Sequence, residues 1–284
     1  KYFGSYCRSI TNAKNMFENN SELTNVEALF TNATNCEKMF YNCTALKSLG
    51  TPNNLIDGKF NGSYAFSYEI ENATQMFYGC SALTDVTMCN LHNLQYASNM
   101  FNYCTKLERV ILPEAVGNTI YGCDCYKMFA NCVNLKYCEC RFANVANAEM
   151  MFYDAGIDGD FHINHTTSSN IATDKMKNAS SMFENSGITN LTWNISYDEE
   201  NIICHSMFKN TNGLQKIEIF GDYNNLSSYS MFSLSHLNTG IFNKVHFNNP
   251  EQLFASINGG NTGTSLEFNN CGITQNDTNG LYLT

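Results

Sequence analysis

The dipeptide Met-Phe recurs along this chain of 284 residues at nearly regular intervals. The intervals between successive phenylalanines lie between 22 and 37 residues, and most lie between 22 and 25. A repeated unit of this length is typical of a solenoid, in which a unit buries its core only by stacking on its neighbours. The phenylalanines are Phe17, Phe40, Phe77, Phe101, Phe129, Phe152, Phe183, Phe208 and Phe232, and a Leu-Phe pair at Phe254 continues the series.

The residues before each phenylalanine have a helical spacing. With the phenylalanine as position 0, position −4 is small throughout, and position −7 is apolar in the clearest units, as at Ile10, Ile70 and Val145. Side chains spaced in this way share one face of about two helical turns, so we predict a short helix at the start of each unit. Position +2 holds residues that tolerate the left-handed conformation ending a helix. These residues are Asn19, Asn42, Gly79, Asn131, Asp154, Asn185 and Asn210.

The residues after each phenylalanine have the spacing of a strand. Position +6 is leucine in most units, and positions +9 and +11 are apolar pairs, such as Val110 with Leu112. Where the turn reads "AGI" or "SGI", the unit is one residue shorter and the pairs become Phe161 with Ile163 and Leu191 with Trp193. Alternation indicates a strand. We therefore predict an α/β repeat solenoid of about ten coils, each with one short helix and one short strand, and a parallel sheet along one face.

Two segments give the repeat in its clearest form, "ATQMFYGCSALTDVTM" from Ala73 and "ASNMFNYCTKLERVIL" from Ala97. The pattern A-x-x-M-F-x-x-C-x-x-L-x-x-L-x-L resembles the BspA-like leucine-rich repeats of bacterial surface proteins and some protozoan parasites. The resemblance extends from about Ile10 to Phe268. It implies a leucine-rich-repeat-like solenoid used for adhesion or other protein recognition within a longer secreted or surface-anchored chain, and it brings no catalytic residues. The irregular insertions, and the lack of proline after most strands, depart from the family pattern and predict an uneven curvature.

We expect residues 1–284 to form a single solenoid domain of a longer chain. The repeats occupy about residues 10–268, and residues 269–284 read as a C-terminal partial or capping coil. The chain has 26 acidic and 16 basic residues, a formal net charge of −10 that repels nucleic acid and anionic lipid. No apolar run approaches the roughly 18 residues of a membrane span. We therefore predict no nucleic-acid partner, no direct membrane insertion, and an extracellular or cell-surface location.

Five of the thirteen cysteines cluster in one segment, namely Cys123, Cys125, Cys132, Cys138 and Cys140. All but Cys123 occupy positions −4, +3, +9 and +11, which hold apolar residues in other units. A free thiol behaves there as a small hydrophobe, so we predict core positions. A zinc site needs two converging C-x₂₋₄-C pairs, which the spacing does not supply. Disulfides between +3 thiols of neighbouring coils stay an alternative, because stacked coils have suitable Cα separations.

Other catalytic or metal-binding patterns are weak. His162 and His165 have the i, i+3 spacing of a metal pair, but His162 lies between the inward-facing Phe161 and Ile163 of a predicted strand. The sequence contains no G-x-S-x-G, P-loop, H-E-x-x-H or calcium-loop motif. We therefore predict no catalytic residue, no cofactor and no metal site.

Outward strand positions form a candidate binding face, or else an ordinary solvated face. Position +8 includes Asp85, Arg109, Tyr137, Asp160 and Lys216. The predicted +10 ladder is Thr87, Ile111, Glu139, His162, Thr192, Glu218, His246 and Glu267.

Three insertions, residues 52–69, 113–121 and 164–175, fall between a strand and the next helix and are predicted to emerge along one edge. The first carries Phe60, Tyr64, Phe66 and Tyr68 among Gly, Ser and Asn, a composition favoured in binding loops. Alternatively, these aromatic side chains cover the exposed groove of a distorted coil.

We therefore predict a non-catalytic recognition or adhesion solenoid that binds a protein or glycan. One alternative is an architectural spacer in a phage fibre or surface assembly. Another is an enzymatic or intracellular regulatory protein with a further domain. The candidate ligand-binding residues are Phe60, Tyr64, Phe66, Tyr68, Tyr121, Arg109, Tyr137, Glu139, His162, Glu218 and His246.

Overall fold

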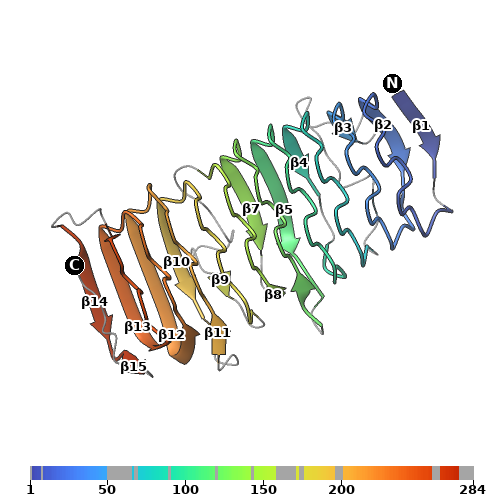
Figure 1. Cartoon of the computed structure of the whole chain (residues 1–284). Coiled ribbons are helices and arrows are strands. Elements are labelled where there is room, and N and C mark those ends of the chain that lie inside the picture. The colour runs from blue at the N-terminus through green and yellow to red at the C-terminus, as the bar shows by residue number, and fades with distance from the viewer. Residues whose placement is uncertain are drawn as a thin grey trace.

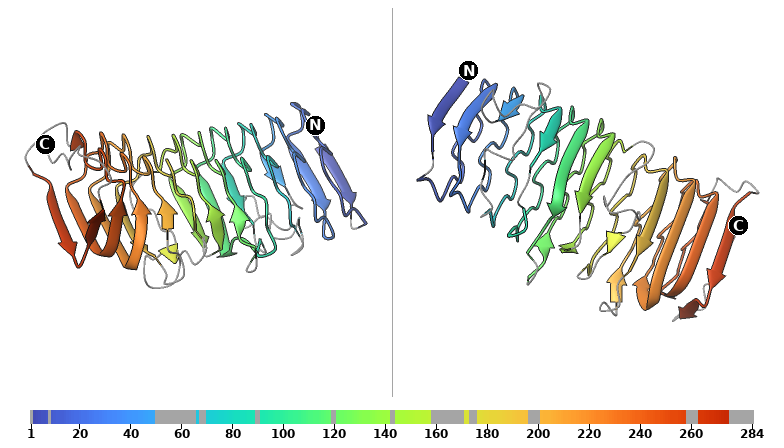
Figure 2. Two further views of the ribbon diagram at one scale, coloured as in Figure 1. Left: turned by 60° about the horizontal axis from the view of Figure 1, so that its bottom comes forward. Right: turned by 180° about the vertical axis from the view of Figure 1, so that it is seen from behind.

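The chain winds into an elongated parallel β-solenoid whose coils stack in a row, with the two termini at opposite ends (Figures 1 and 2). This computed structural model describes residues 2–7, 9–49, 66, 70–88, 91–118, 121–141, 144–157, 171–172, 176–195, 201–257 and 263–274. This architecture confirms the predicted repeat solenoid with a parallel sheet along one face.

Strands form two parallel ladders along the solenoid. The main sheet face contains β1 (Tyr2–Tyr6), β2 (Asn25–Leu29), β3 (Ser48–Leu49), β4 (Asp85–Thr87), β5 (Arg109–Ala115), β7 (Tyr137–Arg141), β9 (Ile171–Ala172), β10 (Asn190–Asn194), β12 (Lys216–Ser227), β13 (Thr239–Asn248) and β14 (Ser265–Asn269). The second, shorter ladder contains β6 (Cys123–Asp124), β8 (Val145–Asn147), β11 (Asn201–Ile203) and β15 (Gly272–Thr274). The long strands β12 and β13 belong to both ladders, because β11 pairs with the end of β12 and β15 with the end of β13.

The predicted helix in each coil is wrong, because the described residues contain no helix. The segment around each phenylalanine is instead a run of consecutive turns. In the first coil the N–H groups of Met16, Glu18 and Asn20 donate to the carbonyl three residues back. The alternating N–H groups donate to the next coil, as from Phe17 to the carbonyl of Met39 at 2.8 Å.

Residues with a left-handed backbone conformation occur at two positions of this turn segment. Position +2 is left-handed as the sequence predicts, and position −2 is left-handed as well. Both sets have φ between 51° and 62°, apart from 71° at Gly79. The −2 residues include Lys38, Gln75 and Met150, whose residue types give no signal for this conformation. A φ near +60° at the third residue of a turn is what allows the successive turns to follow one another without coiling into a helix.

The spacing between coils explains why a helix does not fit. Packed helices need about 8–10 Å between axes. The stacked phenylalanine rings of neighbouring coils have centroids only 5.2–5.5 Å apart. Extended strands and flat turns tolerate this distance, because their N–H and C=O groups bond directly to the neighbouring coil.

A single stack of phenylalanine rings runs through the core. It joins the ten rings from Phe17 to Phe254, and every successive pair lies within 9° of parallel. The rings from Phe40 onward are buried. The inward positions predicted from the sequence surround them, since the small residues at −4, the leucines at +6 and Trp193 are also buried. The helix prediction was wrong, but the small residues at −4, the phenylalanines from Phe40 onward and the leucines at +6 are confirmed as core residues.

Asparagine at position −5 closes the first turn of many coils. Its side-chain oxygen accepts the N–H two residues later, at 3.1 Å for Asn12 to Lys14 and 2.9 Å for Asn72 to Thr74. This local bond is the one that Asn and Asp favour in turns. The same residues also bridge to one another from coil to coil, as Asn35 does with Asn72. The asparagine-rich composition therefore supports an ordered repeat.

We expect truncation of the central ring, Phe152→Ala, to lower the free energy of unfolding by about 3–5 kcal/mol, because it leaves a cavity and breaks two ring contacts. Phe268→Ala is the matched control, since this ring lies in β14, at the C-terminal end of the main sheet face, and is 38% exposed. Denaturant unfolding of both variants measures the difference. An equal decrease in the free energy of unfolding for both variants would contradict the view that the central ring stabilises the core more than the terminal one.

We expect Asn72→Ala to cost about 1 kcal/mol of unfolding free energy, because the Thr74 N–H loses its acceptor. Asn32→Ala is the control, since Asn32 is exposed and its side chain makes no hydrogen bond to the described residues. Its expected cost is below about 0.5 kcal/mol. Thermal unfolding compares the stability of the two variants. Equal stability would contradict the proposed role of the Asn72 side chain in closing the turn.

Candidate functional site

The central sheet face brings predicted outward residues side by side. Asp85, Arg109 and Tyr137 are lateral partners on β4, β5 and β7. The backbone of Ile111 pairs with those of Thr87 and Glu139, whose side chains lie outside those described. The Arg109 guanidinium lies over the Tyr137 ring, 5.2 Å from its centroid. Such a cation–π contact holds two long side chains in one orientation. The face therefore presents an ordered basic and aromatic pair beside the apolar side chain of Ile111.

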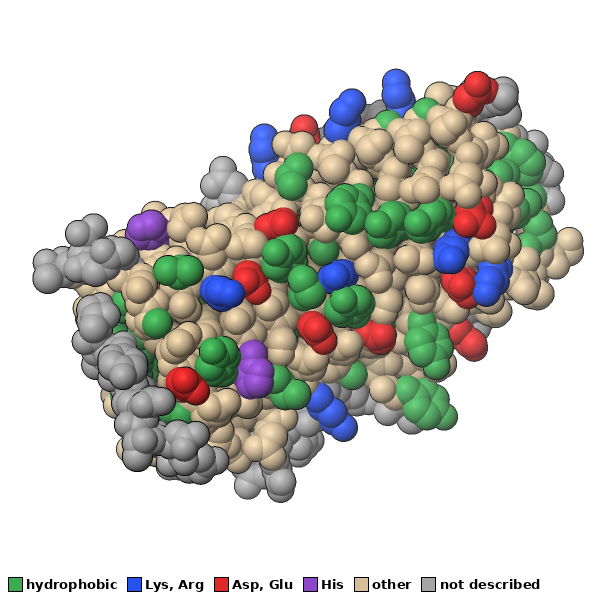
Figure 3. Space-filling model, viewed as in Figure 1, with side chains coloured by type: hydrophobic (Ala, Val, Ile, Leu, Met, Phe, Trp, Pro, Cys, Tyr) green, Lys and Arg blue, Asp and Glu red, His purple; other side chains and the backbone are tan. Residues whose placement is uncertain are grey.

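The C-terminal half of the same face is a polar network. Thr192 donates to a Glu218 carboxylate oxygen at 3.0 Å, and the Lys216 ammonium lies 3.0 Å from the other oxygen. Phe220, two residues beyond Glu218, is 37% exposed. Figure 3 shows one face of the molecule, where acidic, basic and hydrophobic side chains are interspersed among uncharged polar ones. Such mixed chemistry is suited to contact with another molecule.

The predicted position of His246 in this row is wrong. The lateral partner of Glu218 on β13 is Ile241, and His246 pairs with Asn225 and Gly272 on the second ladder. Strand β13 is long enough to enter both ladders, and its apolar alternation continues through Phe242 and Phe247. The sequence therefore offered two apolar pairs and did not indicate which one faces the main sheet.

The predicted loop residues Phe60, Tyr64 and Tyr68 lie outside the described residues, as does His162 of the predicted strand. The predicted strand pair Phe161 and Ile163 also lies outside the described residues, and the partner of Trp193 on β9 is Ile171, within the insertion predicted at residues 164–175. Phe66 is described, and it is only 4% exposed with its ring stacked on Phe30 at 5.7 Å. This ring contributes to the core, as the alternative interpretation of the first insertion predicts.

Tyr121 is the most exposed of the predicted aromatic residues that the structure describes. It is 72% exposed, and its N–H donates to the side-chain oxygen of Asn118 at 3.2 Å. Asn118 bridges to Gly122, so the tyrosine lies in a tight turn between β5 and β6. Among the predicted residues, Arg109 and Tyr137 are in contact, whereas Glu218 belongs to the separate C-terminal network.

The clustered cysteines are core residues. Cys125, Cys132 and Cys138 are buried, and the side chain of Cys140 lies outside those described. Thiols at position +3 donate to the phenylalanine carbonyl of the preceding coil, as from Cys104 to Phe77 at 3.1 Å. The eleven described cysteines are all free thiols, so the alternative of disulfides does not hold for them.

Burial makes these thiols poor nucleophiles. Desolvation raises the pKa of Cys36 to about 12 and raises the pKa of Cys104 well above its usual value, with neighbouring Cys80 and Cys132 adding to the shift of Cys104. The thiolate is the reactive and metal-binding form, and its population at pH 7 is negligible at such pKa values. In the described part of the chain, no three His, Cys, Asp or Glu side chains converge as metal ligands. None of the described segments is a helix long and apolar enough to cross a membrane.

The structure contains a serine–histidine pair, His205 and Ser227, that was not predicted from the sequence. The His205 Nε2 atom lies 2.7 Å from the Ser227 hydroxyl, and the imidazole packs edge-on against Tyr229. Burial lowers the pKa of His205, which favours the neutral ring. Among the described residues no carboxylate hydrogen-bonds to this imidazole, so the pair lacks the orienting acid of a catalytic triad. It is a contact between neighbouring coils.

Comparison with known proteins supports the repeat assignment. Residues 11–157 match the profile described as a BspA type leucine rich repeat region, in six copies. The six copies are fewer than the ten coils expected from the sequence. A crystal structure of a leucine-rich repeat protein from Bacteroides ovatus is similar over 92% of this chain and 76% of its own, with 14% identity and a TM-score of 0.36. No curated protein matches the sequence.

We expect the buried thiols to resist alkylation in the folded protein. Iodoacetamide at pH 8 should modify the half-buried Cys271 first and Cys36 and Cys104 only after unfolding, because raised pKa values and burial both slow the reaction. Peptide mass spectrometry over time gives the order, and a guanidinium-unfolded sample shows that all sites can react. Labelling of Cys104 at the rate of Cys271 would contradict the packing of the thiol row.

Proposed function

Because this chain belongs to the BspA-type leucine-rich repeat family, we propose that it is a non-catalytic recognition solenoid that binds a protein or glycan through its sheet face. The observation that carries this proposal is the ordered row on β4, β5 and β7. There the Arg109–Tyr137 pair lies beside Ile111, held in register by backbone pairing. A rigid surface loses little conformational entropy on binding, which favours affinity.

The remaining features of the proposal concern location and partners. The net charge of −10 disfavours nucleic acid and anionic membranes as partners. An extracellular or surface location is proposed, with a ligand on another cell or within the same envelope. Exposed Tyr121, which follows β5 in the chain, adds an aromatic contact suited to either ligand class. The insertions 52–69 and 164–175 are proposed to contribute further contacts.

An architectural spacer is the second candidate, and the last described coil favours it. Strand β14 pairs with β13 alone among the described strands. Phe268 and, on β15, Ile273 are 38% and 49% exposed at this end. An open edge with exposed apolar side chains can pair with another chain. This function predicts association through the ends and no dependence on the sheet face.

Affinity capture with three proteins tests the recognition function. The wild type is compared with a sheet-face variant, Arg109→Ser with Ile111→Ser and Tyr137→Ser, and with a control that removes the exposed Lys14–Glu37 ion pair from the turn side. The bait is immobilised and exposed to a cell-surface extract. We expect a ligand that the wild type and the control retain, and at least tenfold less of it on the sheet-face variant.

Equal retention by all three proteins would contradict recognition through the sheet face. Concentration-dependent self-association of the wild type, with no retained ligand, would support the architectural spacer instead. Circular dichroism of each variant verifies that the outward substitutions leave the solenoid folded.

A further inference from the structure

Two consecutive coils have a shortened turn. Between positions +3 and the following inward residue, the coils of Phe129 and Phe208 have two residues, Val133-Asn134 and Asn212-Gly213. The coils of Phe152 and Phe183 have only a glycine there, Gly156 or Gly187. The turns of these two adjacent coils therefore project less from the solenoid than the longer turns of the coils on either side.

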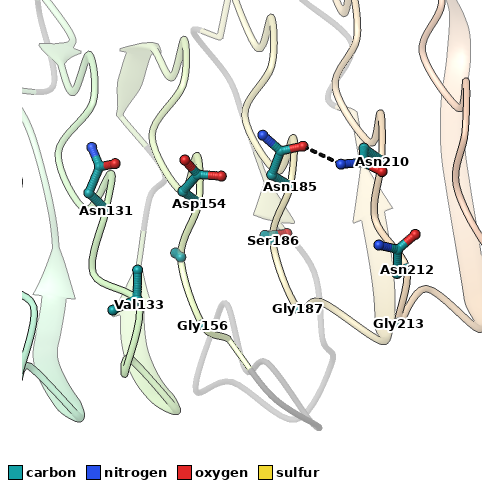
Figure 4. A pocket seen from close by; sticks show the side chains of 11 residues that line it. Asn131, Val133, Asp154, Gly156, Asn185, Ser186, Gly187, Asn210, Asn212 and Gly213 are labelled. Atoms are coloured by element: carbon teal, nitrogen blue, oxygen red, sulfur yellow. Dashed lines mark hydrogen bonds between the residues drawn. The ribbon is translucent and has the colours of Figure 1, made fainter.

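This indentation is an open groove of about 430 Å³ on the turn side of the solenoid (Figure 4). Val133 lines one end and Asn212 the other, and the glycines form the low part between them. Glycine is required at positions 156 and 187 because the backbone of the preceding coil approaches closely. A Cβ atom on Gly156 would lie 1.9 Å from the Val133 carbonyl oxygen, and one on Gly187 would lie 2.5 Å from the carbonyl oxygen of Ile157. The shape is built into the backbone.

The groove contains hydrogen-bonding groups without protein partners. Ser186 is only 3% exposed, and its hydroxyl has no hydrogen-bond partner among the described residues. The hydroxyls at the same position in the next two coils do have partners. Thr211 donates to the Phe208 carbonyl at 2.6 Å, and Ser235 to that of Phe232 at 2.7 Å. The unpaired hydroxyl is therefore particular to the groove.

Position +2 supplies a row of polar side chains across the groove, namely Asn131, Asp154, Asn185 and Asn210. Asn210 donates to the Asn185 oxygen at 2.7 Å, and Asn131 donates to Asn102 outside the groove at 2.9 Å. The Asp154 carboxylate makes no hydrogen bond to another described residue and cannot donate. The amide row is thus interrupted at Asp154, in the first of the two shortened coils.

Apolar side chains flank this polar row at the same repeat position. Tyr103 is 47% exposed in the coil before Asn131, and Leu234 is 51% exposed in the coil after Asn210. Backbone bonds place them in the same ladder, from Tyr103 to Ala130 at 3.1 Å and from Asn210 to Ser233 at 3.0 Å. An aromatic platform beside a few polar groups is typical of a small-ligand site.

The chemistry of these groups selects the ligand class. One carboxylate, several amides and a hydroxyl offer donors and acceptors in similar number, which matches ligand hydroxyl groups that do both. An anionic ligand is disfavoured by Asp154 and by the net charge of −10. The stacked phenylalanine rings of these coils repeat every 5.3–5.5 Å, so groups at equivalent repeat positions recur at about that spacing.

The spacing between coils favours a glycan over an extended peptide as the ligand. An extended peptide advances about 3.3 Å per residue, so side chains on one side recur at about 6.6 Å and lose register within a few coils. One pyranose unit of an extended β-1,4-linked glycan has a length close to one coil, so successive sugars meet equivalent groups. We infer that the groove over the coils of Phe129 to Phe208 binds a neutral β-1,4-linked glycan chain, with about one sugar per coil. This site is separate from the sheet face.

Calorimetric titration with neutral β-1,4-linked hexasaccharides of glucose, mannose, xylose and N-acetylglucosamine tests this site. We expect at least one to bind the wild type, with affinity rising from disaccharide to tetrasaccharide as successive coils are engaged. Asp154→Ala should weaken binding at least tenfold. Insertion of an asparagine between Ser186 and Gly187 should abolish it, because this restores the turn length of the Thr211–Leu214 segment and fills the groove.

Asn19→Ala is the matched control, since Asn19 has the same repeat position in a coil far from the groove, and it should leave the affinity unchanged. The sheet-face triple variant should also bind normally, so loss of recognition through the sheet face and loss of the groove site are distinguishable. Thermal unfolding verifies that each variant is folded. The inference is overturned if the folded wild type binds none of the four hexasaccharides, or if the Asp154 and insertion variants bind as the wild type does.

Discussion

The backbone hydrogen bonds between successive coils fix the distance on which the rest of the structure depends. They hold neighbouring coils close enough for phenylalanine rings to stack with centroids 5.3 Å apart, which is too close for packed helices. Each coil must therefore consist of strands and turns whose N–H and C=O groups point along the solenoid. The left-handed residues at positions −2 and +2 are the local means by which the turn segment meets this requirement.

The sequence predicted the buried positions well and the backbone between them poorly. Residues facing inward at −7, −4 and 0 satisfy the spacing of a helix, but a spiral of consecutive turns presents the same positions. Only the distance to the next coil distinguishes the two, and no single repeat contains that distance. Asn and Gly at +2 indicated the left-handed conformation, whereas Lys38 or Met150 at −2 gave no such signal because tertiary bonding imposes it.

The candidate recognition surface was predictable where repeats have equal turns and connections. Arg109 and Tyr137 became lateral partners as expected, because the register between β5 and β7 follows directly from positions counted from the phenylalanines. The prediction failed at His246. There a second apolar pair follows the first one in the same strand, so two registers satisfy the same alternation. A shift of register moves a side chain to another face, and the pattern alone does not choose between the alternatives.

Variation between coils, rather than any single motif, gives this solenoid surfaces with different chemistry. The interior accepts little change, because each inner ring contacts two others and the +3 thiols and hydroxyls, as at Cys104 and Thr211 but not Ser186, donate to a phenylalanine carbonyl. Turn length is less constrained, since a missing residue is accommodated when glycine permits closer approach, as Gly156 does by donating its N–H to the Cys132 carbonyl at 3.1 Å. Such a deletion lowers the edge without moving the phenylalanine stack, whose spacing stays at 5.3–5.5 Å through both shortened coils. The scaffold and the grooves on its surface can therefore change independently, and new contact surfaces are expected at the edges where turn length varies.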